Sequence, residues 1–326
     1  MRIVRHHEYG PSGVLRTEEA DLPAYGPQDV LVRAEAIGVD HADVQRRLGT
    51  FPLGAPSLPH CPSTDVSGTV VEVGAEVAGI TPGMRVTVWK ARDAYAEYVA
   101  APAARVLPIP AGLDPAEATI LGATGRVAIN LLRTARLAAG ETVLVHAGAG
   151  AVGHIAVQVA RALGAGKVLA TAGSPAKLDF IRSLGADAAI DYTAPDWTER
   201  VAEAAGTGGV DVILDGIGGK QLVTDIHLLA PYGRLVFFGG SGGDAEQPDI
   251  PVLDLLGMRQ VMGFSMPTLL QNRPDLAEEA VRDLVRMVSE GSVRPVIHAR
   301  VPLDEAPHAH DLLERRQSMG RVVLVP

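Results

Sequence analysis

Strand-like and helix-like segments alternate between residues 141 and 239, and this alternation constrains the fold more than any other feature of the chain. Short apolar runs rich in β-branched residues predict strands over 141–148, 167–173, 188–192, 210–215 and 234–239. Segments with helical spacing of apolar residues lie between them, over 152–164, 174–185, 195–206 and 218–233. Strands that alternate with helices in this way predict a parallel, doubly wound sheet with right-handed crossovers.

The segments on either side of this region have a different texture. Residues 29–39, 67–77 and 85–91 are rich in β-branched residues and separated by turns with Gly and Pro, which predicts a small irregular barrel or sandwich. Further helices are expected within 114–140 and over 274–291 and 303–317, before a final strand-like RVVLVP. Because 326 residues suffice for two domains, we expect the α/β region to be inserted between two parts of another domain.

A glycine motif joins the first predicted strand to the first predicted helix. Gly148-Ala149-Gly150-Ala151-Val152-Gly153 fits the pattern G-x-G-x-x-G in the strand–turn–helix context that gives the pattern its meaning. Gly148 would form the tight turn, Gly150 would let the backbone approach a pyrophosphate, and Gly153 would allow close packing of helix and strand. The motif therefore predicts a dinucleotide whose phosphates rest on the N-terminus of the helix.

The end of the second predicted strand indicates which dinucleotide binds. NAD sites usually carry Asp or Glu there to bind the ribose 2′-hydroxyl, whereas this chain has Thr171-Ala-Gly173-Ser174. Lys177 follows one helical turn later, and Tyr192 ends the third predicted strand. A missing carboxylate and a nearby lysine suit a 2′-phosphate, so NADPH is the predicted cofactor.

Charge and composition make several other roles unlikely. The chain has 29 Lys and Arg against 38 Asp and Glu, a formal net charge of −9, so nucleic acid is not expected as the main partner. It has neither an apolar stretch of about 18 residues nor the apolar core of a signal peptide, so we expect a cytoplasmic protein that does not bind membranes. The single cysteine, Cys61, excludes an internal disulfide and a four-cysteine zinc site.

Several stretches together resemble the zinc-free quinone oxidoreductases (the zeta-crystallin-like group) of the medium-chain dehydrogenase/reductase superfamily. They are HEYGPSGVL, VLVRAEAIGVDHADVQRRLGTFP, SGTVVEVGAEV, AYAEYVAAPAARVLPIP, VLVHAGAGAVG and LLERRQSMGRVVLVP. The resemblance implies a GroES-like catalytic domain over 1–118 and 260–326 and an inserted Rossmann domain over 119–259. It also implies NADPH in the cleft between the domains and a homodimer.

The resemblance extends to individual cofactor-binding positions. The 2′-phosphate contacts correspond to Gly173, Lys177, Tyr192 and Arg316, and Ser174 adjoins them. Thr124 matches a threonine near the nicotinamide amide. Further cofactor contacts are expected at the glycine motif, including Ala151 and Val152, and at the loop after the fifth strand, formed by Phe238, Gly239 and Gly240.

The same comparison locates a catalytic segment and argues against zinc. The position of a zinc-binding cysteine in related alcohol dehydrogenases is Asp40 here, and their Gly-His-Glu stretch reads Ser63-Thr64-Asp65, so no metal site is predicted. Residues 40–51 would line the substrate cavity, with Asp40, Asp43, Gln45 and Phe51 as the expected site residues. The family commonly has Asn at position 40 and tyrosines at positions 45 and 51.

Three roles are left open by these residues. Asp40 is either a general acid that protonates or orients the reduced substrate, or a carboxylate satisfied by backbone N–H groups. Arg46-Arg47 would attract an acidic substrate, although paired arginines are more often solvated, and His308 and His310 read as surface residues.

Three functions follow from this reading. The first is an NADPH-dependent reductase that transfers hydride to a quinone without zinc, and the second is an NADPH-dependent reductase of enones or other activated C=C bonds. Because positions 45 and 51 lack the two tyrosines, the sequence favours the second function, reduction of an activated C=C bond. A third, of another class, is a protein that binds NADPH without turnover.

Overall fold

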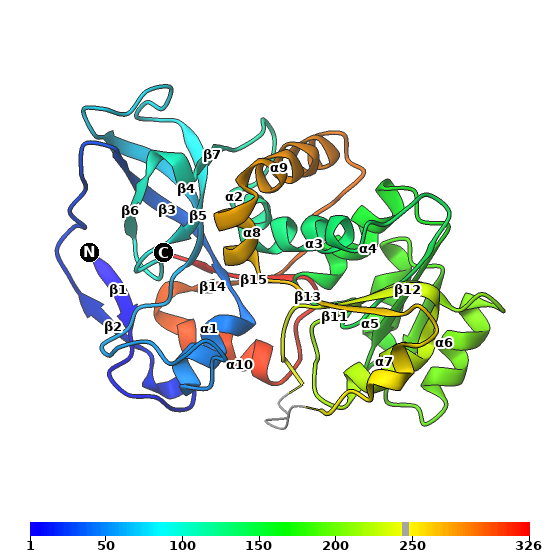
Figure 1. Ribbon diagram of the computed structural model, residues 1–326. Coiled ribbons are helices and arrows are strands. Elements are labelled where there is room, and N and C mark those ends of the chain that lie inside the picture. Colours follow the sequence, from blue (N-terminus) through cyan, green and yellow to red (C-terminus); the bar gives the residue numbers. More distant parts are fainter. Residues whose placement is uncertain (243–247) are drawn as a thin grey trace. The chain divides into compact units, whose positions relative to one another are not determined.

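The computed structural model describes residues 1–242 and 248–326, and the chain in it divides into two units (Figure 1). We call Met1–Ala123 together with Pro295–Pro326 the β unit, and Thr124–Arg294 the α/β unit. Within the described residues, no helix has both the length and the apolar character needed to cross a membrane.

The α/β unit contains the predicted parallel sheet. Six strands lie in the order β10-β9-β8-β11-β12-β13, and every neighbouring pair is parallel. Their bounds are β8 Thr142–Val145, β9 Lys167–Ala172, β10 Ala188–Asp191, β11 Val210–Asp215, β12 Leu229–Phe237 and β13 Gln260–Gly263. Strand β8 is buried along its whole length, as expected for a strand covered on both faces. The predicted doubly wound fold is therefore confirmed.

Helices cover both faces of this sheet. They are α3 Ala123–Thr134, α4 Gly153–Ala162, α5 Pro175–Ser183, α6 Trp197–Ala205, α7 Gln221–Leu228, α8 Met266–Asn272 and α9 Pro274–Ser289, with a short 3-10 turn, η4 Val252–Leu255. Side chains of α6 and α7 pack on the face that presents Leu144, Leu169 and Ile213. Figure 1 shows α3 and α4 on the other side of the strands.

Three boundaries differ from the sequence-based expectation. Residues 260–294 belong to the α/β unit and not to the catalytic domain, because β13 pairs with β12 and extends the parallel sheet. The helix expected within 114–140 is interrupted at Gly122, where an added Cβ would lie 2.3 Å from the Asp65 Cγ. The helix expected over 218–233 ends at Leu228, because Leu229 already belongs to strand β12.

The β unit consists of a seven-stranded sheet and a two-stranded hairpin. The main sheet has the order β14-β15-β3-β4-β5-β7, with β6 also paired to β3. Its strands are β3 Asp29–Val39, β4 Thr64–Val73, β5 Arg85–Ala91, β6 Tyr98–Pro102, β7 Val106–Pro108, β14 Ile297–Pro302 and β15 Arg321–Val325. The hairpin pairs β1 Arg2–Arg5 with β2 Arg16–Glu19. Strand β15 pairs with β3, so the end of the chain completes the sheet begun near its start.

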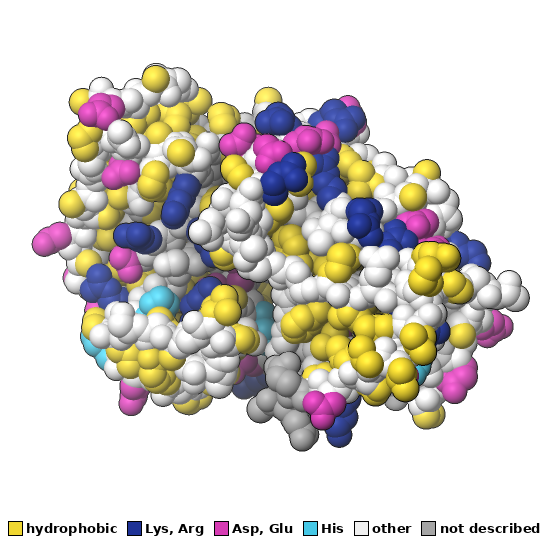
Figure 2. All heavy atoms as spheres, viewed as in Figure 1, with side chains coloured by type: hydrophobic (Ala, Val, Ile, Leu, Met, Phe, Trp, Pro, Cys, Tyr) yellow, Lys and Arg dark blue, Asp and Glu magenta, His cyan; other side chains and the backbone are white. Residues whose placement is uncertain are grey.

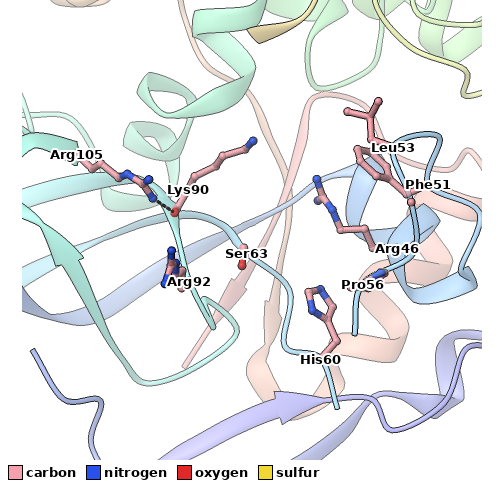
Figure 3. Close-up of a pocket in the computed structure, with 10 residues that line it drawn as sticks. Arg46, Phe51, Leu53, Pro56, His60, Ser63, Lys90, Arg92 and Arg105 are labelled. Atoms are coloured by element: carbon pink, nitrogen blue, oxygen red, sulfur yellow. Dashed lines mark hydrogen bonds between the residues drawn. The ribbon is translucent and has the colours of Figure 1, made fainter. Parts of the chain in front are cut away.

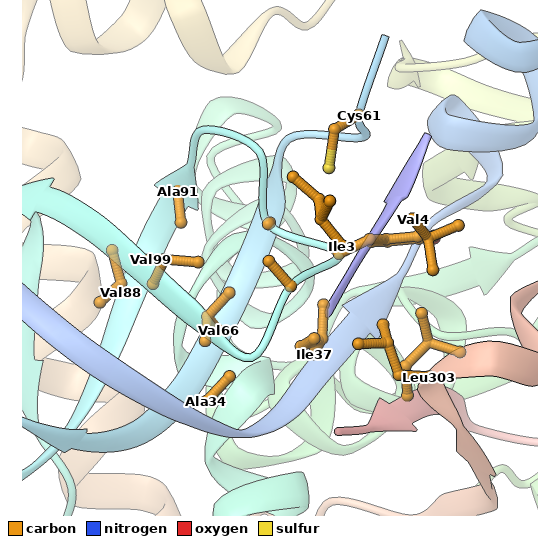
Figure 4. Packing of buried hydrophobic residues seen from close by; sticks show 14 of the residues in the cluster. Ile3, Val4, Ala34, Ile37, Cys61, Val66, Val88, Ala91, Val99 and Leu303 are labelled. Atoms are coloured by element: carbon orange, nitrogen blue, oxygen red, sulfur yellow. The ribbon is translucent and has the colours of Figure 1, made fainter. Parts of the chain in front are cut away.

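Helices of the β unit are short. They are α1 His41–Leu48, α2 Pro115–Ala118 and α10 Ala306–Glu314, with 3-10 turns η1 Ser12–Val14, η2 Ala103–Arg105, η3 Thr119–Leu121 and η5 Leu303–Glu305. The core is mainly aliphatic: Ile3, Ile37, Val66 and Val88 are at most 1% exposed and pack with Cys61 (Figure 4). The cysteine is therefore a core residue.

One buried arginine connects the two ends of the β unit. The guanidinium of Arg321, at the start of β15, is fully buried and bonds to Asp40 at 3.1 Å and to Asp65 at 3.3 Å. An added Cβ on Gly38 would lie 1.7 Å from an Arg321 nitrogen, so only glycine leaves room for the guanidinium. Asp65 also accepts the N–H of Ala123 at 2.6 Å. Burial raises the pKa of Asp65 to about 6, although Arg321 acts in the opposite direction.

We predict that Arg321→Met destabilises the β unit, and more strongly as pH rises. Removing one partner of a buried ion pair costs about 3–5 kcal/mol. Because the native pKa of Asp65 is raised, the native state holds a proton that the unfolded chain releases, and stability falls as pH rises through that pKa. Without Arg321 the pKa of Asp65 rises further. The decrease in the free energy of unfolding caused by Arg321→Met should therefore be larger at pH 8 than at pH 5, by roughly 1 kcal/mol.

Urea unfolding followed by tryptophan fluorescence measures this effect. Of the two tryptophans, Trp89 lies in the β unit and Trp197 in the α/β unit, so a Trp197→Phe background reports on the β unit. Arg300→Met is the control, because the Arg300–Asp114 pair is about half exposed (51% and 46%) and should contribute about 0–1 kcal/mol. Equal losses for the two variants at both pH values would contradict the prediction.

Candidate functional site

The glycine motif lies where the strand order of the parallel sheet reverses. Strand β8 has β9 on one side and β11 on the other, and Gly148–Gly153 connect its carboxyl end to α4. A Cβ on Gly153 would lie 2.2 Å from the Ala147 carbonyl oxygen, and one on Gly148 would lie 2.8 Å from the Ala170 Cβ. Both glycines are therefore required by close packing, which agrees with the tight turn and helix contact predicted for them. Ligands of such sheets bind at this switch point.

Three of the residues predicted to contact a 2′-phosphate cluster at the end of β9. Gly173 follows the strand directly, and a Cβ there would lie 2.6 Å from the Tyr192 hydroxyl oxygen. Ser174 occupies the N-cap position of α5, whose first turn carries Lys177. On the neighbouring strand, Asp191 ends β10 opposite Ala172 and accepts the N–H and the hydroxyl of Thr193 at 2.9 and 2.7 Å. No acid stands at the end of β9 itself.

Two loops meet beyond the ends of β11 and β12. A Cβ on Gly216 would lie 2.8 Å from the Phe238 ring, and Gly216 O accepts the N–H of Ser241 at 3.0 Å. Asp215 closes β11 and accepts the N–H of Gly218 at 3.1 Å. The predicted loop of Phe238, Gly239 and Gly240 is thus joined by a second one, 216–219, which the sequence analysis missed. Its signal was the Gly-Ile-Gly-Gly run after a predicted strand.

A buried histidine–carboxylate pair supports the switch point from inside. His146 follows β8, with Nδ1 at 3.0 Å from the Thr171 hydroxyl and Nε2 at 2.9 Å from Asp225 on α7. Burial alone would lower the pKa of His146, but the Asp225 carboxylate raises it above its usual value. The pair links β8, β9 and α7 beneath the glycine motif. Sequence reasoning missed it because its members are far apart in the chain.

The two remaining predicted cofactor residues lie in different units. Thr124 is buried near the start of α3 in the α/β unit, and Arg316 follows α10 in the β unit with φ at +54°. Their role in cofactor binding stays a prediction.

In the β unit, the segment 40–51 brings the predicted catalytic residues onto one short helix and its flanks. Asp40 is the N-cap of α1; its N–H donates to Asp43 at 3.1 Å, and its carboxylate accepts the Thr64 hydroxyl at 3.1 Å. Burial and Asp40 raise the pKa of Asp43 to about 8, although Arg46, at 3.1 Å, acts in the opposite direction. Asp43 therefore supports the helix from within.

Phe51 forms part of a cavity next to this helix. The Arg46 guanidinium lies 4.3 Å from the Phe51 ring centroid, a cation–π contact, and Figure 3 shows both side chains at the cavity wall. Gln45, on the same helix, is half-buried and is not among the residues that line the cavity. Of the four predicted catalytic residues, only Phe51 contributes to the wall.

Two surface expectations are wrong. Arg47 is fully buried and pairs with Glu314 of α10 at 2.8 Å. His310 is also fully buried, and its Nε2 lies 3.0 Å from the Tyr95 hydroxyl. Burial, helped by Arg47, lowers the pKa of His310 to about 3. Both residues pack α1 against α10, and the charged faces suggested by the sequence pattern are turned inward.

The described residues contain no cluster of side chains typical of a metal site. Among residues 1–242 and 248–326, no three His, Cys, Asp or Glu side chains are grouped so that they could hold a metal ion. Cys61 is 2% exposed, and burial raises the pKa of its thiol. Asp40 and Asp65 are bonded to Arg321.

Comparison with known proteins identifies the family. The model of the alcohol dehydrogenase GroES-like domain matches residues 26–111, and that of the zinc-binding dehydrogenases matches residues 151–286. A 2-haloacrylate reductase from Burkholderia sp. is 34% identical over 100% of this chain and 99% of its own length. A quinone oxidoreductase from Pseudomonas aeruginosa is 33% identical, with 98% of this chain and 97% of that protein covered.

Solved structures agree with this assignment. The Escherichia coli quinone oxidoreductase complexed with NADPH superposes with a TM-score of 0.92 at 29% identity, with all of both chains covered. A structure described as an NAD-dependent alcohol dehydrogenase gives a TM-score of 0.90 at 30% identity, again over both whole chains. The GroES-like and Rossmann folds, the glycine motif at the switch point and these full-length matches lead to one conclusion: the chain belongs to the quinone oxidoreductase family of the medium-chain dehydrogenase/reductase superfamily.

Proposed function

We propose that this oxidoreductase uses NADPH to transfer hydride to a quinone, without zinc. The observation that carries the cofactor assignment is the end of β9, a strand that has no carboxylate of its own there: Gly173 and Tyr192 meet at this point, and Lys177 follows in the first turn of α5. A carboxylate at that position would repel a 2′-phosphate, whereas a lysine attracts one. The E. coli quinone oxidoreductase was solved with NADPH, which supports the same choice.

The described residues fit a dinucleotide. Gly148 and Gly153 allow the β8–α4 turn to pack closely enough for the N–H groups at the start of α4 to face a pyrophosphate. Gly216, Gly239 and Gly240 keep side chains out of the paired loops beyond β11 and β12, where a nicotinamide would lie. NADPH, when bound, supplies a hydride. The protein's own task is to bind, to orient the acceptor and to exclude water.

The proposal that the enzyme works without zinc is supported by the ion pairs that two acidic side chains form. Asp40 and Asp65, at the positions that correspond to metal-binding residues of zinc dehydrogenases, share the Arg321 guanidinium. Asp65 also accepts backbone N–H groups of Lys90 and Ala123. The position of the zinc-binding cysteine is thus occupied by a carboxylate engaged with an arginine, and that of the histidine by Thr64.

Asp40 is proposed as a positioning residue. Its carboxylate is paired with Arg321 at 3.1 Å and accepts the Thr64 hydroxyl at 3.1 Å. A carboxylate held in this way orients α1 and the segment that leads to Phe51.

The alternative function is reduction of an activated C=C bond. The 2-haloacrylate reductase of Burkholderia sp. is at least as similar to this chain as the quinone oxidoreductases. The β-carbon of an activated alkene accepts hydride much as a quinone does, so the same arrangement would serve both acceptors. Gln45 and Phe51 stand where the quinone reductases commonly have tyrosines, which favours acceptors other than simple quinones.

A homodimer is the proposed assembly. Strand β13 is an edge of the parallel sheet, and the segment just before it carries exposed Val252, Leu253 and Leu256, at 73%, 70% and 78%. Figure 2 shows hydrophobic side chains gathered over this part of the α/β unit. Exposed apolar side chains beside an open sheet edge are typical of an interface between identical chains.

The cofactor assignment predicts that Lys177→Gln reduces the preference for NADPH over NADH. Loss of one charge-assisted contact to a phosphate costs about 1.5–3 kcal/mol, which corresponds to roughly 10- to 100-fold in the ratio of kcat/KM values. NADPH oxidation and NADH oxidation with a benzoquinone acceptor measure that ratio. Arg182→Gln is the matched control, since Arg182 lies on the same helix in an exposed pair with Asp179. A wild-type enzyme that prefers NADH would refute the assignment.

The role given to Asp40 predicts a pH profile that does not change shape. The kcat/KM for a quinone in the Asp40→Asn enzyme, measured from pH 5 to pH 9, should run parallel to that of the wild type at a uniformly lower level. The amide keeps the geometry of the side chain but loses the charge opposite Arg321. Disappearance of an ionisation step from the profile would instead show that Asp40 transfers a proton.

The assembly predicts that Leu253→Lys/Leu256→Lys gives a monomer. Charged side chains on both copies would face one another across the interface and be desolvated there. Light scattering after size exclusion measures the mass, and Leu22→Lys, at an exposed leucine of the β unit, is the control. A double variant that keeps the wild-type mass would place the interface elsewhere.

A further inference from the structure

The cavity beside α1 is unusual in its charge. It has a volume of about 350 Å³ and lies wholly within the β unit. Its wall is formed by Arg46, Phe51, Leu53, Gly54, Pro56, His60, Ser63, Lys90, Arg92 and Arg105. Four of these residues are Lys or Arg and none is Asp or Glu, in a chain whose formal net charge is −9.

These cations are poorly neutralised by the protein. Among the described residues, no carboxylate lies within ion-pair distance of Lys90, Arg92 or Arg105; only Arg46 has one, Asp43 at 3.1 Å. Lys90, Arg92 and Arg105 also border a neighbouring cavity that contains Asp93, and no ion pair forms with it there. Burial lowers the pKa of Lys90, and the charges of Arg46 and Arg105 lower it further, whereas those of Asp65 and Asp40 act in the opposite direction.

Lys90 is held in this place by its backbone. Its φ is +48°, in the left-handed region that side chains with a Cβ avoid. Asp65 accepts its N–H at 3.3 Å, and Arg105 donates to its carbonyl oxygen at 3.3 Å. Asp65 is in turn fixed by Arg321. Backbone conformations of this kind persist only where the surroundings enforce them, and they concentrate at binding sites.

The side chains divide the cavity into a cationic part and an apolar part. Figure 3 shows the Lys90 ammonium and the Arg46 guanidinium extending toward one another from opposite walls. Phe51, beneath Arg46, and Leu53 and Pro56 form the apolar side. Burial lowers the pKa of His60 to about 4, so its ring is a neutral hydrogen-bonding group at pH 7. This pattern matches a small, flat molecule that carries one anionic group.

We propose that Arg46 and Lys90 bind the carboxylate of the substrate, so that this enzyme acts on activated alkenes that carry a carboxylate. The proposal rests on the proposed function and narrows its acceptor. Reduction would form a C–H bond at the β-carbon with the hydride of NADPH and another at the α-carbon with a proton from solvent, while the C=C π bond is lost. The products are the saturated acid and NADP⁺.

Cations at the carboxylate do more than bind it. Hydride addition at the β-carbon moves negative charge toward the carboxylate, which is a weak electron-withdrawing group while fully charged. Fixed positive charges stabilise that additional charge as it develops and thereby favour the transition state over the ground state. A neutral alkene or quinone carries no full charge before the hydride adds and therefore gains less binding energy from these groups than a carboxylate does.

A charge-matched pair of acceptors tests the proposal. NADPH oxidation is measured with 2-chloroacrylate and with its methyl ester, in the wild type and in Lys90→Met, Lys90→Arg and Arg16→Met. We expect the ratio of kcat/KM for the acid to that for the ester to fall at least tenfold in Lys90→Met. Lys90→Arg, which keeps the charge, should stay within threefold of the wild type. Arg16→Met, which removes an exposed cation on β2, should leave the ratio unchanged.

A binding measurement separates this proposal from the proposed function. Calorimetric titration with 2-chloropropionate, which cannot be reduced, should give a Kd at least tenfold weaker for Lys90→Met than for the wild type in the presence of NADPH. Turnover of a neutral quinone with an acid-to-ester ratio that Lys90→Met does not alter would overturn the carboxylate site and leave the proposed function standing. If no acceptor is reduced, the proposed function fails, and equal Kd values would overturn the carboxylate site as well.

Discussion

The β unit depends on the buried pairing of Arg321 with Asp40 and Asp65. The arginine is 281 residues from one partner and 256 from the other, so the pair forms only when β15 has joined β3. These three charges are fully or largely buried, and removing any one from water without the other two would destabilise the fold. They compensate one another only in a defined geometry. Gly38 leaves space for the Arg321 guanidinium, and the two carboxylates orient it.

Local structure on both sides of the cavity follows from this pairing. Through Asp40, Arg321 determines where α1 begins, and α1 carries Asp43 and Arg46. Through Asp65, it secures the backbone of Lys90, whose φ of +48° aims the ammonium at the cavity. The carboxylates of Asp40 and Asp65 therefore hold in place the segments that carry two of the cations of the cavity, Arg46 on α1 and Lys90 at β5.

Much of the α/β unit could be predicted from the sequence, because its signals are local. Alternating apolar periodicity located five strands, and Ser174-Pro175 marked the first turn of α5 where the structure has it. The sixth strand, β13, escaped because four residues without flanking alternation resemble a loop until they pair with β12. Helix ends at Gly122 and Leu228 depend on tertiary contacts with Asp65 and on sheet pairing, which periodicity does not contain.

The candidate site was predictable where a motif has a backbone reason and not where charges pair over long distances. Gly148 and Gly153 are needed by their own turn, so spacing alone revealed them. Arg47 and His310 read as surface residues, because nothing near them in sequence shows that Glu314 and Tyr95 will enclose them.

Lys90 carried no sequence signal at all. Its importance arises from a strained φ, two backbone hydrogen bonds and three neighbouring arginines, which come from four separate segments. In a chain with an excess of acid, electrostatic steering cannot rely on net charge and must come from a local field. A compact group of cations in a partly apolar cavity provides such a field. An acceptor in the cavity lies close to these cations, whereas salt screens the more distant acidic groups of the surface. In the proposed carboxylate site, selectivity for the acceptor would therefore depend on Asp40 and Asp65, which hold the start of α1 and the backbone of Lys90 in place.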